Sequence, residues 1–174
     1  MYPKDYIKYL IHFHGDRDYF ECHEILEEYW KQTDPGNKES IWVGLILMAV
    51  SAYHHRRGNF SGAKRTMEKS KRIFELNAES FTAVGLDYQQ LFSLVSDRVE
   101  EIQAKVPYRS FSLPINDPVL LKQCSDKCKE QGLIWESESD LSNNEIVHRH
   151  KLRDRSNVID ERNKAIAAKK AAKN

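Results

Sequence analysis

Apolar residues recur at three- and four-residue intervals along most of the chain, which is the spacing of helices with one buried face. No segment shows the strict alternation of apolar and polar residues that is typical of a half-buried strand. Pro and Gly are scarce and fall between the apolar segments, where they end helices or form turns. We therefore predict an all-α protein with helices at about residues 4–13, 18–32, 39–57, 60–76, 87–105, 118–131 and 143–170.

The same pattern divides the chain into three parts. Residues 1–106 are predicted to form a compact bundle of antiparallel helical hairpins, with residues 41–50, which are apolar on nearly every side, at its centre. Residues 107–142 are predicted to be a connector that starts as an extended, proline-containing segment and includes a short helix. Residues 143–174 are predicted to form an exposed, basic C-terminal helix that extends the bundle.

Two features favour a cytoplasmic protein with no membrane-spanning segment. The longest apolar stretch, residues 41–52, has about a dozen residues, whereas a membrane-spanning helix needs about 20. The three cysteines do not have the even number and paired spacing of a disulfide framework. Reduced thiols in a cytosolic protein are the simpler interpretation.

Positive charge is concentrated at the C-terminus, although the whole chain has a formal net charge of only +1. Residues 148–174 carry nine Lys and Arg residues but only three Asp and Glu residues, so the rest of the chain is mildly acidic. A basic helix can follow nucleic-acid phosphates or contact an acidic protein, and it can also be no more than a solvated surface. Nucleic-acid binding through residues 148–173 therefore stays open. So does packing of a thin apolar stripe on the body or on a second subunit, through Leu152, Val158, Ile159 and Ile166.

An unusual set of polar residues lies on the second predicted helix, at the border between its apolar and acidic faces. His23, Glu27 and Trp30 fall on one ridge of this helix. A His and a carboxylate four residues apart can touch. An antiparallel neighbour would bring the end of the next helix, with His54 or His55, close to this ridge.

Two segments of the sequence match a known family in order and spacing. Residues 19–30, which contain His23, Glu27 and Trp30, are followed by residues 44–46 and 54–59. Over about residues 5–78 the chain resembles the bacterial and archaeal family called domain of unknown function 309. Its motif is His, three residues, Glu, two residues, and then Trp or Tyr. The resemblance implies a compact helical fold and a suggested metal-binding role, but no established activity. Family members often carry Gln where this chain has Leu47.

The ridge has a structural interpretation. His23 would hydrogen-bond Glu27, Arg57 would pair with the carboxylate in a bidentate fork, and Trp30 would cover the pair. Replacing His23 by Ala would then leave the Glu27 carboxylate without its partner, at a cost of about 1–3 kcal/mol.

The ridge also has a metal-binding interpretation. His23, Glu27 and His54 would bind a divalent metal, with Glu24 as an outer candidate ligand and His55 as an alternative third ligand. Catalysis has less support, because the sequence lacks the H-E-x-x-H zinc-protease pattern, a Gly-rich phosphate loop and a nucleophile elbow.

Three hypotheses about function follow. We expect a non-enzymatic accessory or interaction protein, whose partner would be another protein or a second copy of the chain. The alternatives are a metal-binding protein that uses the ridge and a nucleic-acid-associated protein that uses the basic C-terminal helix.

Overall fold

The computed structural model describes residues 1–149 and 156–172, without the side chains of residues 156–161. The described residues form helices and two short 3₁₀ turns, and one isolated bridge between Leu86 and Ile115 is their only β-type pairing. The prediction of an all-α fold is confirmed. The helices are α1 (Lys4–His14), α2 (Tyr19–Thr33), α3 (Ile41–Arg56), α4 (Phe60–Leu76), α5 (Tyr88–Gln103), α6 (Pro118–Glu130), α7 (Asn144–Val147) and α9 (Ser156–Ala171).

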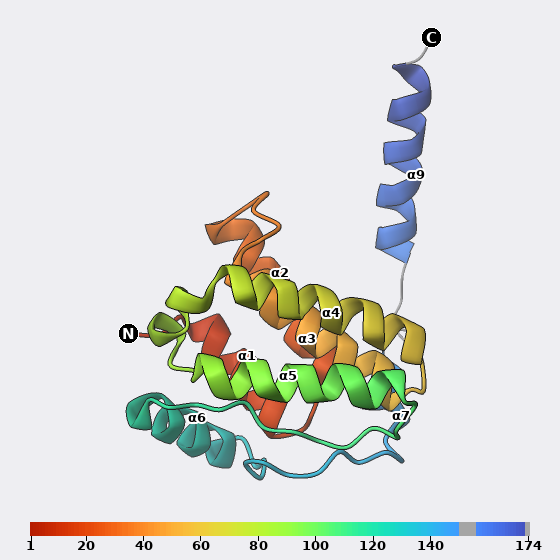
Figure 1. Cartoon of the computed structure of the whole chain (residues 1–174). Coiled ribbons are helices and arrows are strands. Elements are labelled where there is room, and N and C mark those ends of the chain that lie inside the picture. Colours follow the sequence, from red (N-terminus) through yellow and green to blue (C-terminus); the bar gives the residue numbers. More distant parts are fainter. Residues whose placement is uncertain (150–155, 173–174) are drawn as a thin grey trace.

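Consecutive helices from α1 to α5 pack against one another, and α3 lies between α2 and α4 (Figure 1). Helix α4 also packs on α5, and α6 returns to pack on α1. Most of α3 is buried, as its nearly continuous apolar sequence predicts. At Gly44 the contact between α3 and α4 is so close that a Cβ atom would lie 2.7 Å from Cε1 of Phe74.

Side-chain caps fix where the longer helices begin. Each cap accepts a hydrogen bond from a backbone N–H in the first turn that has no partner within the helix. Helix α2 is capped by Asp18, whose Oδ1 lies 3.2 Å from the backbone nitrogen of Glu21. The corresponding caps of α3, α4, α5 and α6 are Ser40, Asn59, Asp87 and Asp117.

The predicted single helix over residues 143–170 is wrong at its start. Helix α7 ends at Val147, which is buried, and His148 has left the helical conformation with φ −120° and ψ 26°. Arg149 then forms an ion pair with the buried Asp18, with Nη2 2.6 Å from Oδ2. The burial of Val147 and the ion pair of Arg149 hold this part of the chain against the helical body. A continuous exposed helix would not make these contacts.

Residues 107–142 are packed onto the helical body. Phe111 and Leu113 from the extended segment, and Leu120, Cys124 and Cys128 from α6, belong to the same hydrophobic core as α1 to α5. Because these residues share the core of the bundle, the predicted connector packs as part of it. The boundaries predicted at residues 106 and 142 remain predictions of organisation along the chain.

Three buried arginines lie where residues 107–142 pack on the helical body. The guanidinium of Arg56 lies 4.6 Å from the ring centre of Tyr19, and that of Arg98 lies 4.3 Å from the ring centre of Phe111. Aromatic faces are favourable neighbours for a guanidinium. Arg17 is also buried and donates to backbone carbonyl groups in residues 107–142. These arginines form a buried polar layer. Through Arg17, this layer connects the α1–α2 loop to residues 107–142.

No helix among the described residues is both long and apolar enough to cross a membrane. Helix α9 stands away from the body in Figure 1, and residues 162–172 are exposed.

Candidate functional site

The predicted contact on the α2 ridge is present. Nε2 of His23 lies 2.6 Å from Oε2 of Glu27, and Nδ1 lies 3.4 Å from Oε1 of Glu24. The other oxygen of Glu27 is paired with Lys31 at 2.7 Å. Partial burial raises the pKa of Glu27, but Lys31 and His23 together outweigh it and hold the pKa below its ordinary value. The Glu27 carboxylate is therefore held by two partners on its own helix.

Trp30 follows on the same helix, but its polar atom is used elsewhere. Its indole N–H donates to the carbonyl oxygen of Asn37 at 3.0 Å. The ring is partly buried against the core. Trp30 therefore fastens the loop between α2 and α3.

The sequence left open which of two adjacent histidines faces the ridge, and the structure separates them. His55 is buried, its Nε2 donates to the carbonyl of Val106 at 2.8 Å, and its ring contacts Phe60 and Tyr108. Burial lowers the pKa of His55 further than this hydrogen bond raises it. His54 is only half-buried and lies on the same side of α3 as Val50. Of the two adjacent histidines, His55 therefore faces the interior and His54 faces the pocket.

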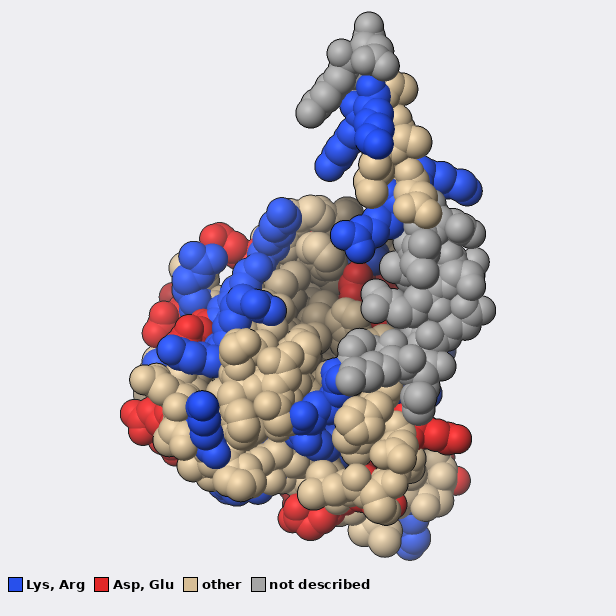
Figure 2. Space-filling model, turned by 90° about the vertical axis from the view of Figure 1, so that its right-hand side faces the viewer, with Lys and Arg blue, Asp and Glu red and all other residues tan. Residues whose placement is uncertain are grey.

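His54 and His23 line one pocket between the start of α2 and the end of α3. The pocket has a volume of about 150 Å³, opens to solvent on one side and has an almost wholly apolar lining. Figure 2 shows a hollowed, mostly uncharged surface bordered by Lys and Arg side chains on the right-hand face of Figure 1. The residues that line the pocket are Tyr19, Phe20, His23, Val50, Tyr53 and His54.

Asn59, the N-cap of α4, determines which ring nitrogen of His54 carries the proton. Oδ1 of Asn59 accepts the backbone N–H of Gly62 at 3.1 Å, so Nδ2 is the atom that faces Nδ1 of His54, at 3.2 Å. Because Nδ2 is a donor, Nδ1 of His54 must be an acceptor. Burial, with Arg57 and Arg65 nearby, lowers the pKa of His54. His54 is therefore neutral at pH 7 and carries its proton on Nε2.

Arg57 lies beside this pocket. Its guanidinium lies 5.2 Å from the ring centre of Tyr53, and its Nε donates to Nδ1 of His148 at 3.1 Å. The carboxylate of Glu27, for which a fork with Arg57 was predicted, is paired with Lys31. Arg57 therefore connects the end of α3 to the start of the C-terminal segment.

The predicted metal ligands do not converge in the described part of the chain. Within it, the only set of three His, Cys, Asp or Glu ligand atoms that lie within 4.8 Å of one another comes from His12, Asp16 and Asp18. His23 and Glu27 touch, but His54 does not complete a set of three with them. The His12 cluster was not predicted from the sequence, where its signal is a His and two Asp across the α1–α2 loop. Its members already have protein partners: His12 contacts Asp16 at 3.1 Å, and Asp18 contacts Arg149.

Replacing His23 by Ala is expected to cost less than the sequence alone suggests. Glu27 keeps Lys31 and is one-third exposed, so its carboxylate would not lose all its partners. We expect a loss of about 0.5–1 kcal/mol in the free energy of unfolding, measured by urea denaturation. Glu27→Ala should cost a similar amount. A loss above about 3 kcal/mol would show instead that the pair is a central structural element.

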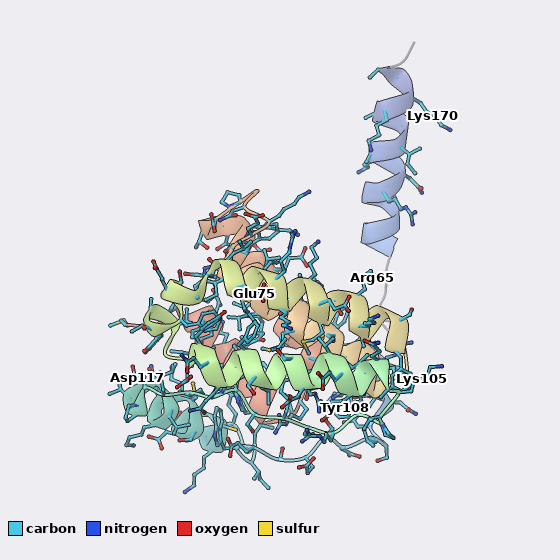
Figure 3. The ribbon with its side chains drawn as sticks, in the orientation of Figure 1. Arg65, Glu75, Lys105, Tyr108, Asp117 and Lys170 are labelled. Atoms are coloured by element: carbon cyan, nitrogen blue, oxygen red, sulfur yellow. The ribbon has the colours of Figure 1, made fainter. Side chains whose placement is uncertain are left out.

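The basic C-terminal helix is described only in part. Arg162, Lys164, Lys169 and Lys170 are exposed on α9, and Figure 3 shows Lys170 directed away from the body. Leu152 and the side chains of Val158 and Ile159 lie outside the described residues, while Ile166 is 45% exposed. Nucleic-acid binding and packing on a second subunit stay predictions.

Comparisons with known proteins agree with the resemblance seen in the sequence. A family model described as domain of unknown function (DUF309) matches residues 6–66, which include α2, α3 and the pocket. The chain is 46% identical over 173 residues to the uncharacterized protein YpuF of Bacillus subtilis strain 168, covering 99% of each chain. No solved structure matches the chain at a significant level. The family match and the full-length relative together show that the chain belongs to the domain of unknown function 309 family.

Proposed function

We propose that this is a non-enzymatic binding protein that holds one small, mostly apolar molecule in the pocket between α2 and α3. The observation that carries the proposal is the pocket itself, because residues of both family segments, including His23 and His54, line one apolar hollow. Small-molecule sites are typically concave and apolar with a few placed polar groups. An engineered protein cavity of about 150 Å³ is large enough to bind benzene.

The lining supports binding in preference to catalysis. Phe20, Val50 and Tyr53 offer contact area, and both nitrogens of His23 are occupied by carboxylates. The cysteines offer no activated nucleophile: burial raises the pKa of Cys22 well above its usual range and that of Cys124 to about 12. Three buried, unbridged thiols also suit a reducing compartment, and we propose the cytoplasm.

A titration with small aromatic molecules tests the proposal. Benzene, toluene and indole, added up to millimolar concentrations, are expected to shift the backbone amide signals of residues 19–23 and 50–54 in two-dimensional NMR spectra. Val50→Phe fills the pocket and should weaken binding at least tenfold. Val99→Phe makes the same change at a partly buried position on α5 and should leave binding intact. If no compound shifts the pocket signals of the wild-type protein, it is not a binding site of this kind.

Metal binding is a second candidate, favoured by the short distance from His23 to Glu27 and by the separate cluster at His12. Elemental analysis of protein incubated with manganese and zinc ions and then desalted distinguishes the two places. Loss of stoichiometric metal in His23→Ala and Glu27→Ala would favour the ridge, and loss in Asp16→Asn alone would favour the α1–α2 loop. Metal-free wild-type protein would exclude both.

A further inference from the structure

We infer that the ligand of the α2–α3 pocket is a small carboxylate anion whose apolar ring or branched chain fills the pocket and whose carboxylate accepts a hydrogen bond from Nε2 of His54. This inference rests on the proposed function and adds the chemical class of the ligand.

His54 offers a ligand a hydrogen-bond donor at the edge of the pocket. The hydroxyl of Tyr19 is hydrogen-bonded to Tyr108, and the two nitrogens of His23 face Glu27 and Glu24. His54 differs, because Asn59 uses Nδ1 and so places the proton on Nε2. A ligand that binds this N–H must present an acceptor, which an ammonium or other N–H cation cannot provide.

The charge around His54 selects an anionic acceptor. Arg57, the C-cap of α3, lies against the ring of Tyr53, a pocket residue, and both Arg57 and Arg65 on α4 act electrostatically on His54. Figure 3 shows Arg65 on α4 near the start of that helix. These two cations favour negative charge at the His54 end, whereas the Glu24 and Glu27 carboxylates are already engaged by His23 at the other. Hydrogen bonds to a charged acceptor are roughly twice as strong as neutral ones.

The size of the pocket limits the rest of the ligand. A volume of about 150 Å³ with an apolar lining accommodates one six-membered ring or a short branched chain. The open side lets the carboxylate remain partly in water, which avoids the cost of burying it completely.

Three molecules of nearly the same shape test the inference: benzoate, neutral benzamide and cationic benzamidine. Binding is measured by the NMR titration described above, at constant ionic strength and pH 7. We expect benzoate to bind about tenfold more tightly than benzamide, and benzamidine to bind most weakly. His54→Phe should bring benzoate down to the affinity of benzamide and leave toluene binding unchanged. The matched substitution His23→Phe should keep the preference for benzoate.

The outcomes separate the two proposals. If toluene and benzamide bind in the pocket but benzoate binds no better, the carboxylate inference is wrong while the binding function stands. Tighter binding of benzamidine, or an unchanged benzoate preference in His54→Phe, overturns the inference in the same way. If none of the compounds binds, the proposed function fails and the inference fails with it.

Discussion

Acidification from pH 7 to pH 3 is expected to remove about 4 kcal/mol of stability through one buried side chain, His14. Its ring is completely buried and stacks on Trp135 at a centroid distance of 4.4 Å. Nδ1 donates to the carbonyl of Leu10 at 2.8 Å, and Nε2 accepts the backbone N–H of Leu113 at 2.9 Å. A second proton can bind only at Nε2, where it would break the bond from Leu113. Burial, assisted by Arg17, lowers the pKa of His14 to about 3.

The sign of the effect follows from comparing the folded and unfolded states. The unfolded chain takes up the proton near its ordinary pKa of 6.5, whereas the folded protein takes it up only near 3. Between these values the unfolded state binds more protons, so the free energy of unfolding falls as the pH falls. Well above pH 6.5 both states are neutral at this residue, and it then adds no pH dependence.

Urea denaturation at a series of pH values measures this contribution. His14→Gln replaces the imidazole by an amide that does not titrate in this range. This variant should be less stable at pH 7, because it cannot reproduce both hydrogen bonds, but it should lose much less stability between pH 6.5 and 3. His12→Gln serves as the control. The pKa of His12 is raised above its ordinary value, so this substitution should not reduce the loss of stability between pH 6.5 and 3. Equal acid slopes in wild type and His14→Gln would contradict the prediction.

The sequence predicts the elements of this fold because each element is specified locally. The predicted limits of α4 agree with the structure, and Asn59 and Gly58 at its start are signals within the sequence. The central position of α3 follows from its composition, and the contact of His23 with Glu27 follows from helical spacing. Each of these predictions depends on residues within a single helix or in the turn beside it.

The site and the buried polar layer depend on contacts that spacing does not encode. His14 meets Leu113 across 99 positions, and Arg17 meets Phe111 across 94. An arginine or histidine in the sequence is ordinarily read as exposed, because the carbonyl group that satisfies it is not visible there. For the same reason the sequence could not decide between His54 and His55. Adjacent residues face different neighbours only once α4 and α5 are packed in place.

Replacing Arg17 by Ala is expected to cost about 2–5 kcal/mol and to loosen residues 107–118 and 133–139. Its Nε donates to the carbonyl of Ser137 at 2.7 Å, and its Nη1 donates to that of Phe111. Removing the guanidinium leaves both acceptors without this donor, and a smaller side chain leaves a cavity. Hydrogen exchange should therefore become faster in both segments than in α3, whose backbone bonds do not involve Arg17.

A glycine variant separates the hydrogen bonds from the backbone conformation. Arg17 has a φ of +56°, in the left-handed region where a side chain costs about 1–2 kcal/mol relative to Gly. Arg17→Gly loses the same hydrogen bonds as Arg17→Ala but relieves this strain, so it should be more stable than the alanine variant by about 1 kcal/mol. Arg109→Ala, which removes an exposed ion pair with Glu101, should cost less than about 1 kcal/mol. If Arg17→Ala costs no more than Arg109→Ala, the buried guanidinium does not hold residues 107–139 on the bundle. The apolar contacts of Phe111 and Leu113 would then be sufficient to hold them there.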